Sequence, residues 1–94
     1  MDIINKAKRM RDIGNEYENL LNELLNFLFK IIPECIALEM EDSLIPIYST
    51  SVLKTKGILA FPYKCKGEIG YIVLTQEGIF FEIPNGESRK IYSF

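Results

Sequence analysis

The stretch that decides the fold runs from Ile3 to Ile32 and reads IINKAKRMRDIGNEYENLLNELLNFLFKII. Its apolar side chains recur every seven residues in two interleaved series, which are Ile3, Met10, Tyr17, Leu24 and Ile31, and Ile13, Leu20 and Phe27. This spacing is typical of a helix with one buried seam. It predicts one long helix over residues 1–33, which ends at Pro33 because a residue before proline disfavours helical backbone.

The second half of this stretch carries more apolar surface than one seam needs. On one interpretation the helix packs inside the chain, against a sheet. On the other, part of the stripe meets a second helix, such as that of a second copy. The self-association or partner interface would then consist of Met10, Tyr17, Leu20, Leu24, Phe27, Leu28 and Ile31. Gly14 lies inside the pattern, where it marks a bend or the close approach of another element.

Residues 57–94 form a series of short β-branched and aromatic runs separated by turn residues. Gly78 is placed to take a positive φ in a tight turn, and Asn85-Gly86 is a strong hairpin signal. Residues 34–56 are expected to form an irregular or edge-strand segment, with a strand over 36–40 and a short helix as the alternative there.

These elements predict a single α+β domain over residues 1–94. In it, one long N-terminal helix packs on an antiparallel β-meander of four to five strands. Both faces of the central strands are largely apolar, so both need a cover. The helix covers one face, and the middle third of the chain or a partner must cover the other.

Composition argues against several classes of protein. Of the 94 residues, 48% are apolar and 26% are charged, which is typical of a folded domain. A net charge of −2 argues against nucleic-acid binding, which usually needs a basic face. The sequence shows no secretory leader and no apolar run long enough to span a bilayer, so a cytoplasmic location is expected. Cys35 and Cys65 are expected to be reduced thiols in or near the core, with a disulfide as the alternative.

The sequence shows no recognisable catalytic or cofactor site. Histidine, the commonest general base, is absent. Hard metal ligands cluster only at Glu39, Glu41 and Asp42, without the spacing of a calcium-binding loop. No glycine-rich phosphate loop precedes a helix. We therefore expect no catalytic residue, no metal ion and no cofactor, and a protein that is not an enzyme.

Two basic groups are candidates for contact with an anionic surface. The first lies on the amphipathic start of the chain and consists of Lys6, Lys8, Arg9 and Arg11. It suits an anionic membrane, although a solvated helix face is the simpler interpretation. The second lies near strand ends, where it would contact an anionic partner, and consists of Lys64, Lys66, Arg89 and Lys90. Scattered turn residues are the simpler interpretation of this group.

The run GYIVLTQEGIFF from Gly70 to Phe81, followed by a turn and RKIYS from Arg89 to Ser93, resembles the central hairpin of bacterial pleckstrin-homology-like (GRAM-like) domains. Those domains show an apolar strand ending in Leu-Thr, a tight turn, an aromatic-rich strand and a basic-apolar strand. The resemblance implies a membrane-associated or protein-docking module without catalysis. The long helix stands before these strands, whereas the closing helix of the family follows them.

These features favour a non-enzymatic protein–protein interaction module with a protein partner, expected to form a homodimer. The profile fits a small inhibitor of viral or mobile-element origin that occupies a surface of its partner. The alternative is a membrane-peripheral lipid-binding module that uses the basic start of the chain. A third interpretation is a small-ligand sensor or an enzyme with a pocket between helix and sheet.

Overall fold

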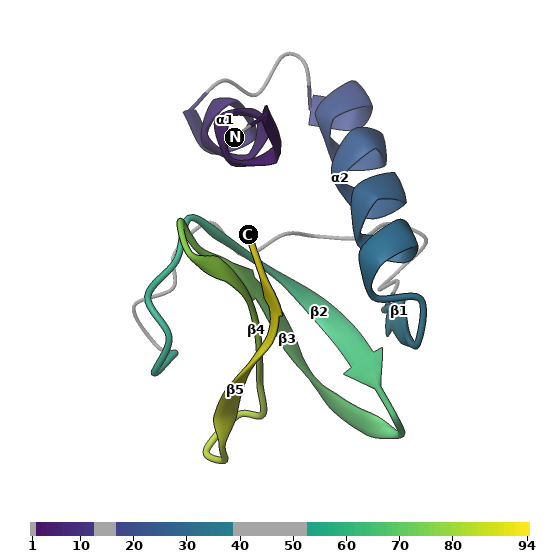
Figure 1. Cartoon of the computed structure of the whole chain (residues 1–94), viewed down its shortest axis with the longest axis vertical. Coiled ribbons are helices and arrows are strands. Elements are labelled where there is room, and N and C mark those ends of the chain that lie inside the picture. The colour runs from purple at the N-terminus through teal and green to yellow at the C-terminus, as the bar shows by residue number, and fades with distance from the viewer. Residues whose placement is uncertain (1, 13–16, 39–52) are drawn as a thin grey trace.

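The computed structural model describes residues 2–12, 17–38 and 53–94. It confirms the α+β class, because two helices lie beside one antiparallel sheet of five strands (Figure 1). Helix α1 spans Asp2–Asp12 and helix α2 spans Tyr17–Ile31. The strands lie side by side in chain order and are β1 (Cys35–Ala37), β2 (Leu59–Cys65), β3 (Glu68–Leu74), β4 (Gly78–Glu82) and β5 (Ser88–Ser93).

The prediction of one long helix over residues 1–33 is wrong, because the structure contains two shorter helices in this region. Figure 1 shows α1 nearly end-on and α2 from the side, so the two axes cross steeply. A seven-residue repeat defines which face of a helix is buried, but it does not require one continuous helix. Ile4 of α1 and Leu28 of α2 reach the same core from different directions. Gly14, where the pattern allowed a bend, lies in residues 13–16, outside the described part of the chain.

The antiparallel meander predicted for residues 57–94 is confirmed as β2 to β5. Strand β1 joins it at the edge by pairing with β2, where Ile36 lies opposite Lys64. The strand predicted over 36–40 therefore exists, but it begins one residue earlier and ends at Ala37. Met40 lies outside the described residues.

The hairpin between β2 and β3 turns through Lys66 and Gly67. Both residues have positive φ, 51° and 84°. Positive φ at both central positions defines a type I′ turn, whose twist matches that of the flanking strands. Cys65 and Glu68 pair directly across this turn, so both lie at the very end of the hairpin.

The hairpin between β4 and β5 is also confirmed, but its turn is centred one residue earlier than predicted. The Gly86 N–H donates to the Ile83 carbonyl at 2.8 Å, so Pro84 and Asn85 are the central residues. Asn85 has a φ of 58°. Proline followed by a residue of positive φ is the pattern of a type II turn.

Gly78 closes the turn between β3 and β4 without the positive φ that the sequence suggested. It is required for space, because a Cβ there would collide with the Tyr92 carbonyl oxygen of β5. Thr75 holds the turn: its N–H donates to the Gly78 carbonyl at 2.9 Å, and its Oγ1 accepts from the Gly78 N–H at 3.1 Å. The prediction of a turn was correct, and the predicted reason for the glycine was wrong.

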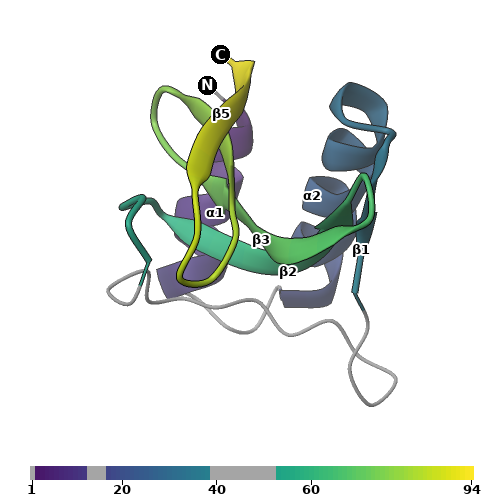
Figure 2. The same cartoon turned by 90° about the horizontal axis from the view of Figure 1, so that it is seen from below.

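The main core lies between both helices and one face of β2, β3 and β4, with Phe61 and Phe81 among its fully buried side chains. Figure 2 shows that this sheet is strongly bent. On the opposite face, Leu53 packs against Ala60 and Val73, which have no exposed surface. The middle third of the chain therefore contributes to the second cover, as one of the two predicted alternatives required.

The two cysteines form a disulfide between β1 and β2, which corrects the prediction of reduced thiols. Cys35 and Cys65 lie directly opposite each other, with their Cα atoms 4.3 Å apart. Narrow pairs in an antiparallel sheet have Cα atoms about 4.5 Å apart, which brings opposite side chains close together. Both residues are buried beside the core, as predicted. The two cysteines are 30 positions apart in the chain, so only the pairing of the strands reveals the bond.

Candidate functional site

Strand β1 forms one edge of the sheet. The Leu38 N–H donates to the Pro62 carbonyl at 3.0 Å, so it points inward, toward β2. Backbone groups of successive strand residues point to opposite sides, so the N–H and C=O of Ala37 point outward. Among the strands that the structure describes, none pairs with this outer side. The edge therefore presents a donor and an acceptor in the geometry that an added strand requires.

An apolar groove of about 290 Å³ lies beside this edge, between α2 and β1. Its lining includes Leu25, Asn26 and Phe29 of α2, Pro33, Ile36 of β1 and Tyr63 of β2. Phe29 is 70% exposed and Ile36 is 66% exposed, although both side chains are large and apolar. Exposed apolar side chains gathered around a groove mark a surface for interaction, because covering them removes apolar area from water.

Helix α2 turns different sides to the core and to the groove. Four of the residues predicted as an interface have described side chains, namely Leu24, Phe27, Leu28 and Ile31. Leu24 and Leu28 have no exposed surface, and Phe27 and Ile31 are partly buried against the core. At these positions the seam packs inside the chain, as the first interpretation of the heptad pattern held. The side chains of the other three predicted residues, Met10, Tyr17 and Leu20, lie outside the described part of the structure.

Tyr63 lines the groove, and only 3% of its surface is exposed. Burial raises the pKa of its hydroxyl to about 12, so the side chain is neutral under physiological conditions. The groove side chains named above carry no charge. Their polar groups are the hydroxyl of Tyr63 and the amide of Asn26. Because a charge buried without a partner is costly, the groove fits an apolar side chain.

A second cavity, of about 240 Å³ and referred to below as the basic cavity, reaches the disulfide. Three of the four residues predicted to contact an anionic partner line it, namely Lys66, Arg89 and Lys90. The ammonium of Lys90, however, lies 5.9 Å from the centre of the Phe80 ring, on the opposite face of the sheet. Glu34 and both cysteines also line it, and Cys35 is shared with the apolar groove. Lys64 does not line it, because a side chain next to Cys65 in β2 points to the opposite face of the sheet.

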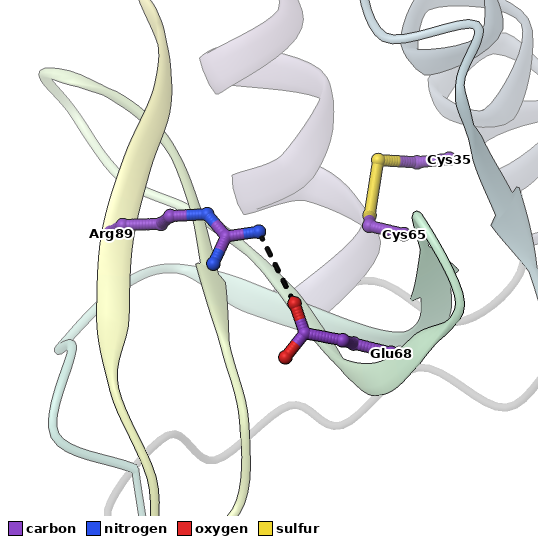
Figure 3. The surroundings of a disulfide bond; sticks show 4 residues. All are labelled: Cys35, Cys65, Glu68 and Arg89. Atoms are coloured by element: carbon purple, nitrogen blue, oxygen red, sulfur yellow. Dashed lines mark ion pairs between the residues drawn. A yellow bond between two sulfur atoms is a disulfide. The ribbon is translucent and has the colours of Figure 1, made fainter.

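Arg89 extends from β5 toward the hairpin end that carries Cys65 and Glu68 (Figure 3). Its Nη2 lies 3.6 Å from Glu68 Oε1, and its Nη1 donates to Glu87 Oε1 at 2.8 Å. The hydrogen bond to Glu87, together with the charge of Glu68, raises the pKa of Arg89. The guanidinium also lies 5.6 Å from the centre of the Phe81 ring. Arg89 thus has partners within the chain.

The first basic group lies on α1, whose apolar side is already in use. Ile3, Ile4 and Ala7 are buried in the main core. Lys6 Nζ lies 3.1 Å from Glu23 Oε2 of α2 and helps to join the two helices. The apolar side of α1 and Lys6 therefore serve the fold.

Glu82 is a buried carboxylate that the sequence analysis did not single out. Its two oxygens accept hydrogen bonds from the backbone N–H of Lys54 at 2.7 Å and of Thr55 at 2.8 Å. Burial raises the pKa of Glu82, but these bonds and those from the Thr55 and Ser88 side chains outweigh it and hold the pKa below its usual value of 4.5. The carboxylate fixes the segment after residue 52 to the sheet. A lone acid in the apolar run from Ile79 to Ile83 was the signal for such a role.

We expect Glu82→Gln to lower the free energy of unfolding at neutral pH by about 1.5 to 3 kcal/mol, because charged hydrogen bonds are lost. A carboxyl whose pKa is lowered by folding stabilises the fold above its unfolded pKa, and this contribution disappears as the pH falls through the folded pKa. Urea unfolding across a pH series should therefore show the gap between wild type and variant closing below pH 4.5, the usual value. A gap that is constant with pH would contradict this role.

Within the described residues, no group of three or more His, Cys, Asp or Glu side chains is arranged to hold a metal ion. In the same part of the chain, neither helix has the length and apolar character that crossing a bilayer demands.

The sequence analysis missed the two exposed groove residues for different reasons. Phe29 lies outside the heptad positions. The available signal was that it is an apolar residue that the seam does not need. Ile36 lies in a short run with little contrast between apolar and polar positions, so its face was not predictable.

Comparisons of this chain with protein-family models, with curated proteins and with solved structures found no match.

Proposed function

We propose that this protein is a non-enzymatic protein-binding module that takes an extended, apolar segment of a partner protein as an added strand on the outer side of β1. The observation that carries this proposal is the outer edge of β1, with which no strand in the described part of the chain pairs, beside an uncharged groove. Ala37 offers the backbone bonds, and the groove offers a place for a side chain. Strand addition of this kind obtains affinity from the main chain and specificity from alternate side chains.

The groove also indicates the chemistry of the segment. Successive side chains of an added strand point to opposite faces of the sheet. One set would face α2 and contact Phe29 in the groove, and the other would lie beside Ile36 on the outer face. Both exposed side chains are apolar, so an apolar side chain is favoured on each side of the segment.

The membrane-binding alternative has less support from the described residues. A peripheral amphipathic helix needs an apolar side that is free to enter the lipid. The apolar side of α1 is instead buried, with Ile3 and Ile4 at most 5% exposed.

The test is a selection of random peptides of about ten residues, the length of a long strand, against the immobilised full chain. The Kd of selected peptides is then measured for wild type and variants by calorimetry. Ala37→Pro removes the outward N–H without removing a bond to β2, and an edge strand tolerates proline there. We expect Ala37→Pro and Phe29→Glu each to weaken binding by about tenfold or more.

Ile69→Glu is the matched control, because Ile69 is an equally apolar and 62% exposed sheet residue that does not line the groove. Its Kd should equal that of wild type. Binding that survives both groove variants, or that depends on Ile69, would overturn the proposal. Light scattering supplies a further check. A dimer that Ala37→Pro converts to a monomer would show that a second copy occupies the edge in place of another protein.

A further inference from the structure

The disulfide separates two cavities of different character. Cys35 lines the apolar groove and also, together with Cys65, the basic cavity. The two residues are 6% and 3% exposed, so access to the bond is through these cavities. A molecule that enters the basic cavity therefore meets the cross-link that holds β1, the strand on which the proposed binding edge depends.

The basic cavity favours an anionic ligand. Lys66, Arg89 and one acid, Glu34, line it with charged groups, whereas the ammonium of Lys90 lies 5.9 Å from the centre of the Phe80 ring, on the opposite face of the sheet. Arg89 is already paired with Glu68 and Glu87, whereas Lys66 forms no ion pair with any residue that the structure describes. Cations near a cysteine favour its thiolate, which is both the attacking species and the leaving group in thiol–disulfide exchange.

We propose that the Cys35–Cys65 disulfide is a thiol–disulfide exchange site, opened by a small thiol bearing carboxylates that enters the basic cavity, and that its state controls the edge formed by β1. The existence of the exchange site is independent of the proposed function, and only its effect on peptide binding rests on that function.

The exchange is balanced in two steps. The thiolate of the small thiol attacks one cysteine sulfur, and the S–S bond breaks. The electron pair of that bond stays on the sulfur of the other cysteine, which takes a proton from water. The thiolate of a second small thiol attacks the mixed disulfide and releases the first cysteine, which also takes a proton from water. The protein disulfide is reduced by two electrons, and two molecules of the small thiol are oxidised to one disulfide.

Opening this bond removes the covalent link from a strand of three residues. The remaining attachments include the backbone pairing to β2, with the bond from the Leu38 N–H to the Pro62 carbonyl, and the bond from the Cys35 N–H to the Ile32 carbonyl at 3.0 Å. Short segments with few bonds open locally at low cost in free energy. We expect the amide exchange rate of Leu38 to rise at least about tenfold on reduction, whether or not a partner exists.

The test compares the rate of opening by glutathione, a negatively charged thiol, with that by cysteamine, a positively charged thiol. Thiols freed in the folded chain are trapped by alkylation and counted by mass spectrometry. The ratio of the glutathione rate to the cysteamine rate should fall by about fivefold or more in Lys66→Glu. Lys64→Glu, on the opposite face, is the matched control and should change the ratio by about twofold or less.

An unchanged ratio in Lys66→Glu, or a bond that neither thiol opens in the folded chain, would overturn this inference. The two proposals fail separately. If the bond opens as expected and Leu38 loses protection, but no peptide binds, the proposed function fails and the exchange site stands. If peptides bind at the β1 edge with equal Kd before and after reduction, control of the edge is refuted and the proposed function stands.

Discussion

Reduction of the Cys35–Cys65 disulfide is expected to lower the free energy of unfolding by about 3 to 4 kcal/mol. The bond closes a loop between residues that are 30 positions apart, so its loss enlarges the set of unfolded conformations. For a chain of this size the melting temperature should fall by roughly 15 to 30 °C. Urea unfolding of the oxidised and the reduced protein measures the difference directly.

Cys35→Ala supplies the control for this measurement. The variant contains no disulfide, so its stability should be the same with and without reductant. If reduction leaves the stability of wild type unchanged, the cross-link between β1 and β2 is refuted.

Leu28→Ala is expected to lower the free energy of unfolding by about 2 to 5 kcal/mol, because it leaves a cavity among the fully buried side chains of α2 and the sheet. The neighbouring change Phe29→Ala should alter stability by about 0.5 kcal/mol or less, because Phe29 is mostly in water. Urea unfolding of the two variants side by side measures this contrast between adjacent residues.

Equal effects of Leu28→Ala and Phe29→Ala would contradict the orientation of α2. A small effect at Leu28 combined with a change in solution mass would support the other interpretation of the heptad seam, in which it joins two copies. The expected pattern leaves Phe29 available to a partner and assigns Leu28 to the fold.

The strands and their order were largely predictable because turn residues mark their ends. Gly67, Gly78 and the segment from Pro84 to Gly86 separate runs of β-branched and aromatic residues. Short connections of this kind join antiparallel neighbours, so the order of β2 to β5 follows from local sequence. The exact turn residues were less predictable, since positive φ at Asn85 and a close approach at Gly78 are set by the paired strand.

Two features had no local signal of this kind and were not predictable. They are the division of the helix into α1 and α2, and the disulfide. The heptad series continues across residues 13–16 without a break in its spacing, so periodicity alone indicated one element. The disulfide depends on β1 pairing with β2 across a long connection, and no local signal specifies that pairing. Once the pairing is known, Cys35 and Cys65 are directly opposite each other.

The candidate site was predictable only in outline. The surplus of apolar residues in the second half of the helix indicated an interaction surface, but the predicted residues followed the seam. Leu24 and Leu28 on that seam are buried, and Phe29 outside it faces the groove. The side of a helix that remains exposed depends on where the sheet lies, which the sequence pattern of the helix does not contain.

The most direct test of the binding edge is amide hydrogen exchange at Ala37, measured by NMR with and without a selected peptide. In the free protein the outward Ala37 N–H should exchange quickly, while the inward Leu38 N–H is protected. In the complex we expect Ala37 to become protected by at least about tenfold, because its N–H donates to the added strand. A bound peptide that leaves Ala37 unprotected would contradict strand addition at β1.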